Sequence, residues 1–323
     1  MKAIIHIGLE KTGTTTIQNF IYKNKKTLES KNIFLTKSFG YPNNNLLSYI
    51  SIDQPSASKN NFKNHDFQLF KKNIIKKAKI ELSDSLNKHN FLFSSEHLHS
   101  QLKSQKEISH FKKTLHILGF KSFSIIITLR PIIEMHRSRI STAFKNGNFV
   151  EPKITEPWKF KTPHIYQIKN TLKDWMSVFG ENNINAIRYS RKTLLRDFFE
   201  IVDKDISLDH LKSINNKNKS LSYEIMEAIY SNKILIEKNL PLKDQKINFV
   251  NTLINVFEMH PDQNKISISR DAQIKYNKSF QLDSEFTQSN FNFSIDSKCI
   301  TEKKQISNKE LILKINDHIK KII

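Results

Sequence analysis

The opening of the chain constrains its fold more than any other stretch. An apolar run at residues 3–7 (AIIHI) is bounded by Gly8, and a short loop then leads through Gly13 into a helix-patterned stretch at residues 14–26. A strand followed at once by a glycine loop and a helix is the first unit of a parallel sheet, and it places the N–H groups of the helix start at the sheet edge. The sequence therefore predicts a parallel α/β fold that begins at its N-terminal strand.

The same alternation of strand and helix patterns continues to about residue 205. Short apolar runs of strand type are bounded by turn residues, and amphipathic stretches of helical period separate them. The expected strands lie at 33–35, 91–93, 123–129 and 184–189. The expected helices lie at 67–87, 103–118, 132–145, 165–179 and 192–202. This order predicts a three-layer α/β/α arrangement, with helices on both faces of a central parallel sheet.

Beyond about residue 205 the pattern weakens into helical stretches and polar linkers. The clearest helical stretches are residues 223–237 and 311–322. We therefore expect an α/β domain over residues 1–205 and a mostly helical extension over residues 206–323, packed on the same domain.

Two stretches of the expected α/β domain lack any regular period. Residues 36–66 are rich in Asn, Ser and Lys and contain two prolines, and residues 148–164 contain three prolines and Trp158. Loops of this length are usually functional or mobile. We expect both to contribute to the binding of a substrate.

The charge of the chain favours anionic partners without identifying one. The formal net charge is +21 over 323 residues, which suits nucleotides, acidic polysaccharides or nucleic acids. The lysines are scattered along the whole chain, however, which also fits a coding bias toward Lys, Asn and Ile. The sequence has no zinc-finger spacing, no glycine-aromatic RNA motif and no concentrated basic helix, so a nucleic-acid partner is not expected.

Neither a membrane span nor an internal disulfide is expected. The apolar runs are far shorter than the roughly 20 residues of a membrane helix, and the opening residues read as a strand and not as a signal peptide. The single cysteine, Cys299, excludes an intramolecular disulfide and fits a reducing compartment. We expect a cytoplasmic protein, whose oligomeric state the sequence does not predict.

The loop GLEKTGTTT differs at one informative position from the loop that binds nucleoside triphosphates, G-x-x-x-x-G-K-[ST]. Gly8 and Gly13 have the required separation, and Thr15 stands at the Ser/Thr position. Thr14 replaces the lysine that reaches the β- and γ-phosphates. The nearest cation, Lys11, lies on the body of the loop, where it suits a first phosphate and the group attached to it. The layout therefore disfavours ATP hydrolysis.

Residues 4–20 resemble the 5′-phosphosulfate-binding loop of sulfotransferases that use 3′-phosphoadenosine 5′-phosphosulfate (PAPS), especially the bacterial and carbohydrate-type members. The likeness is carried by the segment HIGLEKTGTTTIQNF. It implies a P-loop-like fold and PAPS as the donor, with Lys11 stabilising the leaving oxygen and no metal required, because PAPS leaves as an ordinary bisphosphate. The residues implied to hold the 5′-phosphosulfate are Lys11, Thr12, Gly13, Thr14, Thr15 and Thr16.

A second segment suits a phosphate group independently. Arg130 ends the strongest expected strand, Pro131 suits the first turn of the next helix, and Ser138 follows eight residues after Arg130. Ligands of parallel sheets collect at the carboxyl ends of strands, and a guanidinium with a hydroxyl makes a phosphate clamp. The segment RPIIEMHRSRISTAFKNG is similar to the 3′-phosphate-binding segment of the same sulfotransferases. This likeness implies that Arg130 and Ser138 bind the 3′-phosphate.

A sulfuryl transfer also requires a base that takes the proton of the acceptor. Glu96 and His97 follow the strand expected at residues 91–93, so they would face the same crevice as the loop. Carbohydrate-type relatives often place a Glu at a comparable strand end and the cytosolic type uses a His, which makes Glu96 the first candidate and His97 the second. Two other interpretations stay open: Glu96 as an acid at a helix N-terminus, or as the Mg²⁺-binding acid of a nucleotidase.

The residues and the resemblance together predict a sulfotransferase that uses PAPS to sulfate a hydroxyl or amine of a carbohydrate or glycolipid acceptor. One alternative is a P-loop kinase of a small metabolite that uses ATP and Mg²⁺, which the missing loop lysine disfavours. The less favoured alternative is a basic nucleic-acid-binding protein.

Overall fold

The computed structural model of the protein divides the chain into two units. The first unit comprises Met1–Arg130, Thr162–Asn215 and Leu282–Ile295, and the second comprises Pro131–Lys161, Asn216–Gln281 and Asp296–Ile323. The units thus alternate along the chain. The residues that the structure describes are 1–52, 64–83, 90–160, 163–213, 220–257, 265–297 and 308–323. Cys299 and residues 53–63 of the expected loop lie outside them.

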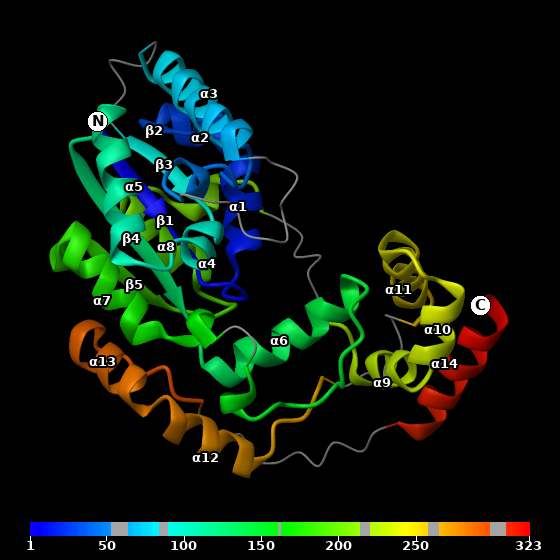
Figure 1. The fold of residues 1–323 in the computed structure, drawn as a ribbon. Coiled ribbons are helices and arrows are strands. Elements are labelled where there is room, and N and C mark those ends of the chain that lie inside the picture. The colour runs from blue at the N-terminus through cyan, green and yellow to red at the C-terminus, as the bar shows by residue number, and fades with distance from the viewer. Residues whose placement is uncertain (53–63, 84–89, 161–162, 214–219, 258–264, 298–307) are drawn as a thin grey trace. The chain divides into compact units, whose positions relative to one another are not determined.

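Five parallel strands form the sheet of the first unit, in the order β2-β3-β1-β4-β5 (Figure 1). The strands are β1 (Lys2–His6), β2 (Ile33–Phe34), β3 (Asn90–Ser94), β4 (Ser122–Leu129) and β5 (Ile184–Arg188). They confirm the predicted α/β fold with a central parallel sheet. Because β1 connects toward the β2 edge and β4 toward the β5 edge, the neighbouring carboxyl ends of β1 and β4 mark the switch point of the sheet, where ligands of such sheets bind.

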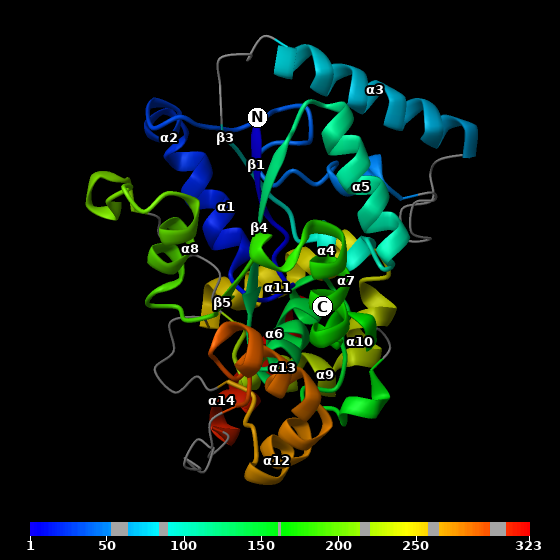
Figure 2. The same ribbon diagram turned by 90° about the vertical axis from the view of Figure 1, so that its left-hand side faces the viewer.

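One face of the sheet is covered by three helices (Figure 2). They are α1 (Thr14–Lys23), α2 (Lys25–Ser30) and α8 (Leu194–Val202). Every second side chain of the strands points to this face, so Ile4 of β1, Leu92 of β3 and Ile126 of β4 share one apolar core with the helices.

The opposite face is aromatic and is covered by α5 (Gln105–Ile117) and α7 (Ile168–Phe179). The ring of Phe123 on β4 lies 5.3 Å from that of Phe179 on α7, and Phe111 on α5 lies 6.1 Å from Trp175 on α7. The three-layer α/β/α arrangement expected from the sequence is therefore present. The first unit also holds α3 (Asn64–Ser83), α4 (His97–Gln101) and most of α13 (Gln281–Phe291).

Local signals set both ends of α5. At its start, Ser104 Oγ accepts the Glu107 N–H at 3.3 Å, and the Glu107 carboxylate accepts the Ser104 N–H at 3.0 Å, which forms a capping box. At its end, Gly119 takes a φ of 94°, and its N–H and that of Phe120 bond to carbonyls of the last turn. This left-handed glycine turn closes the helix.

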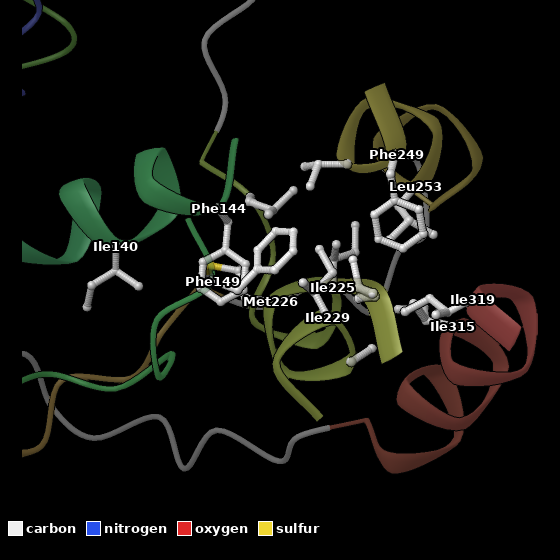
Figure 3. Close-up of a cluster of buried hydrophobic side chains, with 14 of the residues drawn as sticks. Ile140, Phe144, Phe149, Ile225, Met226, Ile229, Phe249, Leu253, Ile315 and Ile319 are labelled. Carbon is white, nitrogen blue, oxygen red and sulfur yellow. The ribbon is translucent and has the colours of Figure 1, made fainter. Parts of the chain in front are cut away.

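The second unit has an apolar core of its own (Figure 3). Its helices are α6 (Ile132–Lys145), α9 (Tyr223–Ser231), α10 (Lys233–Asn239), α11 (Lys243–Phe257), α12 (Arg270–Ser279) and α14 (Lys309–Ile322). Phe144 of α6, Ile229 of α9 and Ile315 of α14 are fully buried within this core. Helix α6 has the bounds that its sequence predicts. The expectation that residues 206–323 form one extension stays a prediction.

The helix expected at residues 223–237 is two helices, α9 and α10. They meet at Asn232, whose side-chain amide donates to the Ala228 carbonyl and to Asn316 Oδ1 of α14, both at 2.8 Å. An asparagine that caps the preceding turn in this way competes with continued helical bonding, and the helix breaks there.

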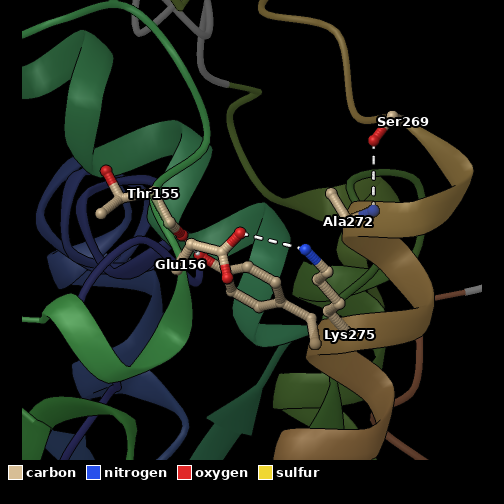
Figure 4. A network of polar contacts seen from close by, with 6 residues as sticks. Thr155, Glu156, Ser269, Ala272 and Lys275 are labelled. Atoms are coloured by element: carbon tan, nitrogen blue, oxygen red, sulfur yellow. Dashed lines mark hydrogen bonds and ion pairs between the residues drawn. The ribbon is translucent and has the colours of Figure 1, made fainter.

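Residues 148–160 of the proline-rich segment are held by polar contacts within the second unit (Figure 4). The Tyr276 hydroxyl of α12 donates to the Thr155 carbonyl, and Lys275 Nζ lies 3.2 Å from the Glu156 carboxylate. The Thr155 N–H donates to Nε2 of His136 at 3.2 Å. Burial, aided by the Arg139 charge, lowers the pKa of His136 to about 4, so the imidazole is neutral near pH 7 and can accept this bond. A role of the segment in substrate binding stays a prediction.

Within the described ranges, no helix combines the length and the apolar character that crossing a lipid bilayer requires.

Candidate functional site

The loop between β1 and α1 exposes the start of a helix at the sheet edge. The first bonds of α1 run from the N–H groups of Thr16 and Ile17 to the Gly13 carbonyl, at 2.9 and 3.1 Å. The N–H groups of Thr14 and Thr15 precede these bonds, and no side chain caps the helix. Such a helix start attracts anions, because its N–H groups and the positive end of the helix dipole point outward.

Gly13 is required where it stands. Its φ of 89° is left-handed, and a Cβ at this position would lie 2.4 Å from Leu194 Cδ2 and 2.9 Å from Tyr189 Cε2. A real Cβ does not approach other atoms so closely, so the bare Cα lets the end of β5 and the start of α8 pack directly on the loop. Lys11 also has a positive φ, 68°, which is uncommon for a residue other than glycine.

The threonines of the loop divide into two kinds. Thr12 and Thr14 are buried, and their hydroxyls donate to the Leu9 carbonyl at 2.6 and 3.4 Å. Thr15 is exposed and Thr16 is half-buried. The side chains of Thr12 and Thr14 therefore shape the loop, and these two residues can offer an anion their backbone N–H groups, whereas Thr15 can also offer its hydroxyl.

Arg130 reaches this loop from the end of β4. Its Nη1 donates to the Lys11 carbonyl at 3.0 Å, and its guanidinium carbon lies 4.8 Å from the centre of the Tyr189 ring. The structure thus brings Arg130 to the loop that contains Lys11 and Gly13, although 119 residues separate Arg130 from Lys11. Ser138 lies on α6 in the second unit, and its pairing with Arg130 stays a prediction.

Glu96 and His97 lie at the end of β3, and both are half-buried. Gln18, on α1 and 5% exposed, donates through Nε2 to Glu96 Oε2 at 3.0 Å and to the Ser94 carbonyl at 3.2 Å. The helix that begins at the loop therefore holds the Glu96 carboxylate directly. His97 is the first residue of α4, a helix that the sequence did not indicate.

His6 lies beneath the loop as a buried core residue with hydrogen-bond partners for both ring nitrogens. It is fully buried, and its Nδ1 and Nε2 lie 2.9 Å from Ser94 Oγ and 3.3 Å from Thr128 Oγ1. Burial lowers the pKa of His6 to about 3, so the ring is neutral near pH 7. A Cβ on Gly8 would lie 3.2 Å from His6 Cε1, so this ring supports the loop from below.

Sequence reasoning overlooked three residues that shape this site. The ring of Tyr189, the last residue of the strand expected at 184–189, lies 4.8 Å from the guanidinium carbon of Arg130 and borders Gly13. Asn44, from the expected loop at 36–66, is buried and accepts the Ser94 N–H through Oδ1 at 2.9 Å. Gln18 lies four residues after Thr14, on the same side of the helix, and this spacing from the loop was the available signal.

Metal ligands do not gather in the described part of the chain. There, no group of three or more His, Cys, Asp or Glu side chains is arranged to hold a metal ion.

The fold and this site define an α/β protein with a P-loop-like turn whose lysine lies on the loop body. No protein family matches the chain by sequence profile, and no curated protein matches it by sequence. Among solved structures, the chain is similar to the crystal structure of a sulfotransferase from Alicyclobacillus acidocaldarius. The two share 10% identity with a TM-score of 0.44, over 90% of this chain and 96% of that one.

Proposed function

We propose that this protein is a sulfotransferase that moves the sulfuryl group of PAPS to a hydroxyl or amine of a carbohydrate or glycolipid acceptor. The observation that carries the proposal is the loop after β1. The start of α1 has no side-chain cap and suits an anion, and Thr14 occupies the position of the lysine in a triphosphate loop. Arg130 reaches the loop from the end of β4, the strand beside β1 in the sheet.

The residues at the sheet edge suit both ends of the donor. The N–H groups at the start of α1 and the half-buried Lys11 would hold the 5′-phosphosulfate. Arg130 has five N–H donors in a planar fork, and one of them meets the Lys11 carbonyl. In our proposal, this guanidinium and Ser138 hold the 3′-phosphate.

The reaction requires little covalent participation from the protein. The acceptor oxygen or nitrogen forms a bond to sulfur while the bond between sulfur and the bridging oxygen breaks, and the electron pair of that bond stays on the 5′-phosphate. Lys11 would stabilise the charge on this leaving oxygen, and Glu96 would take the proton of the acceptor, with His97 as the second candidate. Positioning and electrostatics contribute most of the rate in the related transfer of phosphoryl groups.

The acceptor is proposed from the resemblance of the motifs to carbohydrate-type sulfotransferases. Both expected substrate loops, residues 36–66 and 148–164, are rich in polar or proline residues and are the proposed walls of its binding site. A sugar hydroxyl has a high pKa, so the transfer needs a general base close to the donor, and Glu96 at the end of β3 is the proposed base.

A thermal-shift titration separates the proposal from its rivals. A ligand that binds only the native state raises the melting temperature, and the rise grows with the logarithm of the ligand concentration relative to its Kd. We expect adenosine 3′,5′-bisphosphate to raise it by several degrees, and ATP with Mg²⁺ and duplex DNA to leave it nearly unchanged. A shift with ATP and Mg²⁺ alone would indicate a kinase instead.

The transfer itself is measured with labelled PAPS and a panel of glycans and glycolipids. Glu96→Gln should lower turnover at least 100-fold while leaving bisphosphate binding intact, because only the base is removed. Unchanged turnover would exclude Glu96 as the base and direct attention to His97.

A further inference from the structure

Gln18 makes two hydrogen bonds that link the first helix to the end of β3. Its Nε2 lies 3.0 Å from Glu96 Oε2 and 3.2 Å from the Ser94 carbonyl oxygen, and its side chain is almost fully buried. A side-chain amide nitrogen carries two hydrogens, so one is available for each acceptor. The bond to the Ser94 carbonyl thereby fixes the plane of the amide and aims its second N–H at Glu96.

We propose that Gln18 is a positioning residue that holds the Glu96 carboxylate in place to receive the proton of the acceptor. This inference rests on the proposed function, in which Glu96 is the general base. Gln18 itself touches neither the donor nor the acceptor in this account.

Two physical effects follow from the bond to Oε2. An N–H that donates to a carboxylate makes a charge-assisted hydrogen bond, which holds the carboxylate in one orientation. The bond also leaves Oε1 as the oxygen that receives the proton when the acceptor bonds to sulfur. Since a displacement of about 1 Å can cost 100-fold in rate, a carboxylate anchored by a buried amide has an advantage over one that rotates in solvent.

The simpler alternative is that Gln18 only joins α1 to β3, through the Ser94 carbonyl. Both roles predict that loss of Gln18 lowers activity. They differ in one respect: a positioning role acts through the Glu96 carboxylate, so it disappears when that carboxylate is absent.

A double-mutant cycle tests this difference, using Gln18→Met, Glu96→Gln and the double variant. Methionine keeps the length of the side chain and removes both donors. A hydrogen bond to a charged group contributes about 1.5–3 kcal/mol, so Gln18→Met should lower kcat about 10- to 100-fold in the otherwise unchanged chain. In the Glu96→Gln background, the same substitution should change kcat less than about 2-fold.

Binding of adenosine 3′,5′-bisphosphate is measured for all four proteins as the control for folding and for the donor site, and it should be unchanged. An equal loss of kcat in both backgrounds would overturn the positioning role while the proposed function stands. A wild-type protein that transfers no sulfuryl group from PAPS would overturn the proposed function itself, and this inference with it.

Gln18→Glu provides a second test, which also serves if the methionine variant loses bisphosphate binding. It has nearly the shape of glutamine but places a second carboxylate within hydrogen-bonding distance of Glu96. Because two adjacent carboxylates do not ionise independently, the acid limb of the kcat/KM profile should move to higher pH by one unit or more. An unmoved acid limb would contradict contact between Gln18 and the base.

Discussion

The close packing on Gly13 can be tested by adding a single methyl group. Gly13→Ala imposes a side chain on a left-handed backbone (φ 89°) and places its Cβ 2.4 Å from Leu194 Cδ2. The backbone contributes about 1–2 kcal/mol of destabilisation. The clash with Leu194 and Tyr189 adds about 1–3 kcal/mol, which is the usual cost of overpacking a core.

Gly119→Ala is the matched control. Gly119 has nearly the same backbone angle, φ 94°, but its Cβ would meet only the end of the Met1 side chain, at 3.0 Å. A flexible side chain can move away, so this variant should show the backbone cost alone. The difference between the two variants therefore isolates the clash at the loop.

Urea denaturation measures the free energy of unfolding of both variants. We expect Gly13→Ala to be less stable than Gly119→Ala by about 1–3 kcal/mol. Gly13→Ala should also bind adenosine 3′,5′-bisphosphate at least 10-fold more weakly, whereas Gly119→Ala should bind it normally. Equal stability and equal affinity would refute the close packing of Tyr189 and Leu194 on this loop.

Three further substitutions concern the proposed transfer site, the core beneath the loop and the second unit. Lys11→Ala should lose transfer activity by at least 100-fold in a labelled-PAPS assay while remaining folded, because it removes the cation that we propose stabilises the leaving oxygen. Full activity would remove Lys11 from the mechanism. The pKa of His6 is about 3 in the folded protein, and it returns to its ordinary value near 6.5 on unfolding. Below about pH 6.5 the unfolded state therefore binds a proton that the folded state does not, and the free energy of unfolding falls as the pH drops. Between pH 6.5 and 5 this proton uptake lowers the free energy of unfolding by about 2 kcal/mol. Urea denaturation as a function of pH should show this loss in wild type and not in His6→Asn. Identical pH profiles of the two proteins would contradict the prediction. Asn232→Ala should destabilise the second unit by about 1 kcal/mol in thermal unfolding, because the hydrogen bonds to Asn316 and Ala228 are lost. Asn239→Ala is its control: it removes one hydrogen bond on the exposed surface and should have little effect.

The parts of the fold that the sequence predicts are those with a strong local pattern. The strand at Ser122–Leu129 contains an unbroken apolar run at Ile125–Ile127, and α6 has an amphipathic stripe between Pro131 and Gly147. Asn232 was not recognised as a helix end, because the buried Ile229 and Ile236 on either side continue one helical stripe across it. Its hydrogen bond to Asn316 depends on a partner 84 residues away, and no local pattern reveals such a partner.

The candidate site was predictable in its loop and less so in its support. The glycines and the strand-end arginine carry local signals, so Gly13 and Arg130 were identified from the sequence. Gln18 was not, because a polar residue in an amphipathic helix usually faces solvent. Its role depends on the approach of α1 to the end of β3, which is a property of the tertiary structure. Likewise, the burial of the Thr12 hydroxyl depends on how the loop folds back on Leu9.

In our proposal, one nucleotide is recognised at two ends, by the loop after β1 and by Arg130. Calorimetric titration of wild type and Arg130→Ala with adenosine 3′,5′-bisphosphate and with adenosine 5′-phosphate separates the contributions of the two ends. We expect wild type to bind the bisphosphate at least 10-fold more tightly than adenosine 5′-phosphate, since a hydrogen bond to a charged group contributes about 1.5–3 kcal/mol. Arg130→Ala should lose this preference while its affinity for adenosine 5′-phosphate stays within about 2-fold of wild type. A wild type without the preference, or a variant that weakens both ligands equally, would show that Arg130 supports the loop through the Lys11 carbonyl and does not bind the 3′-phosphate.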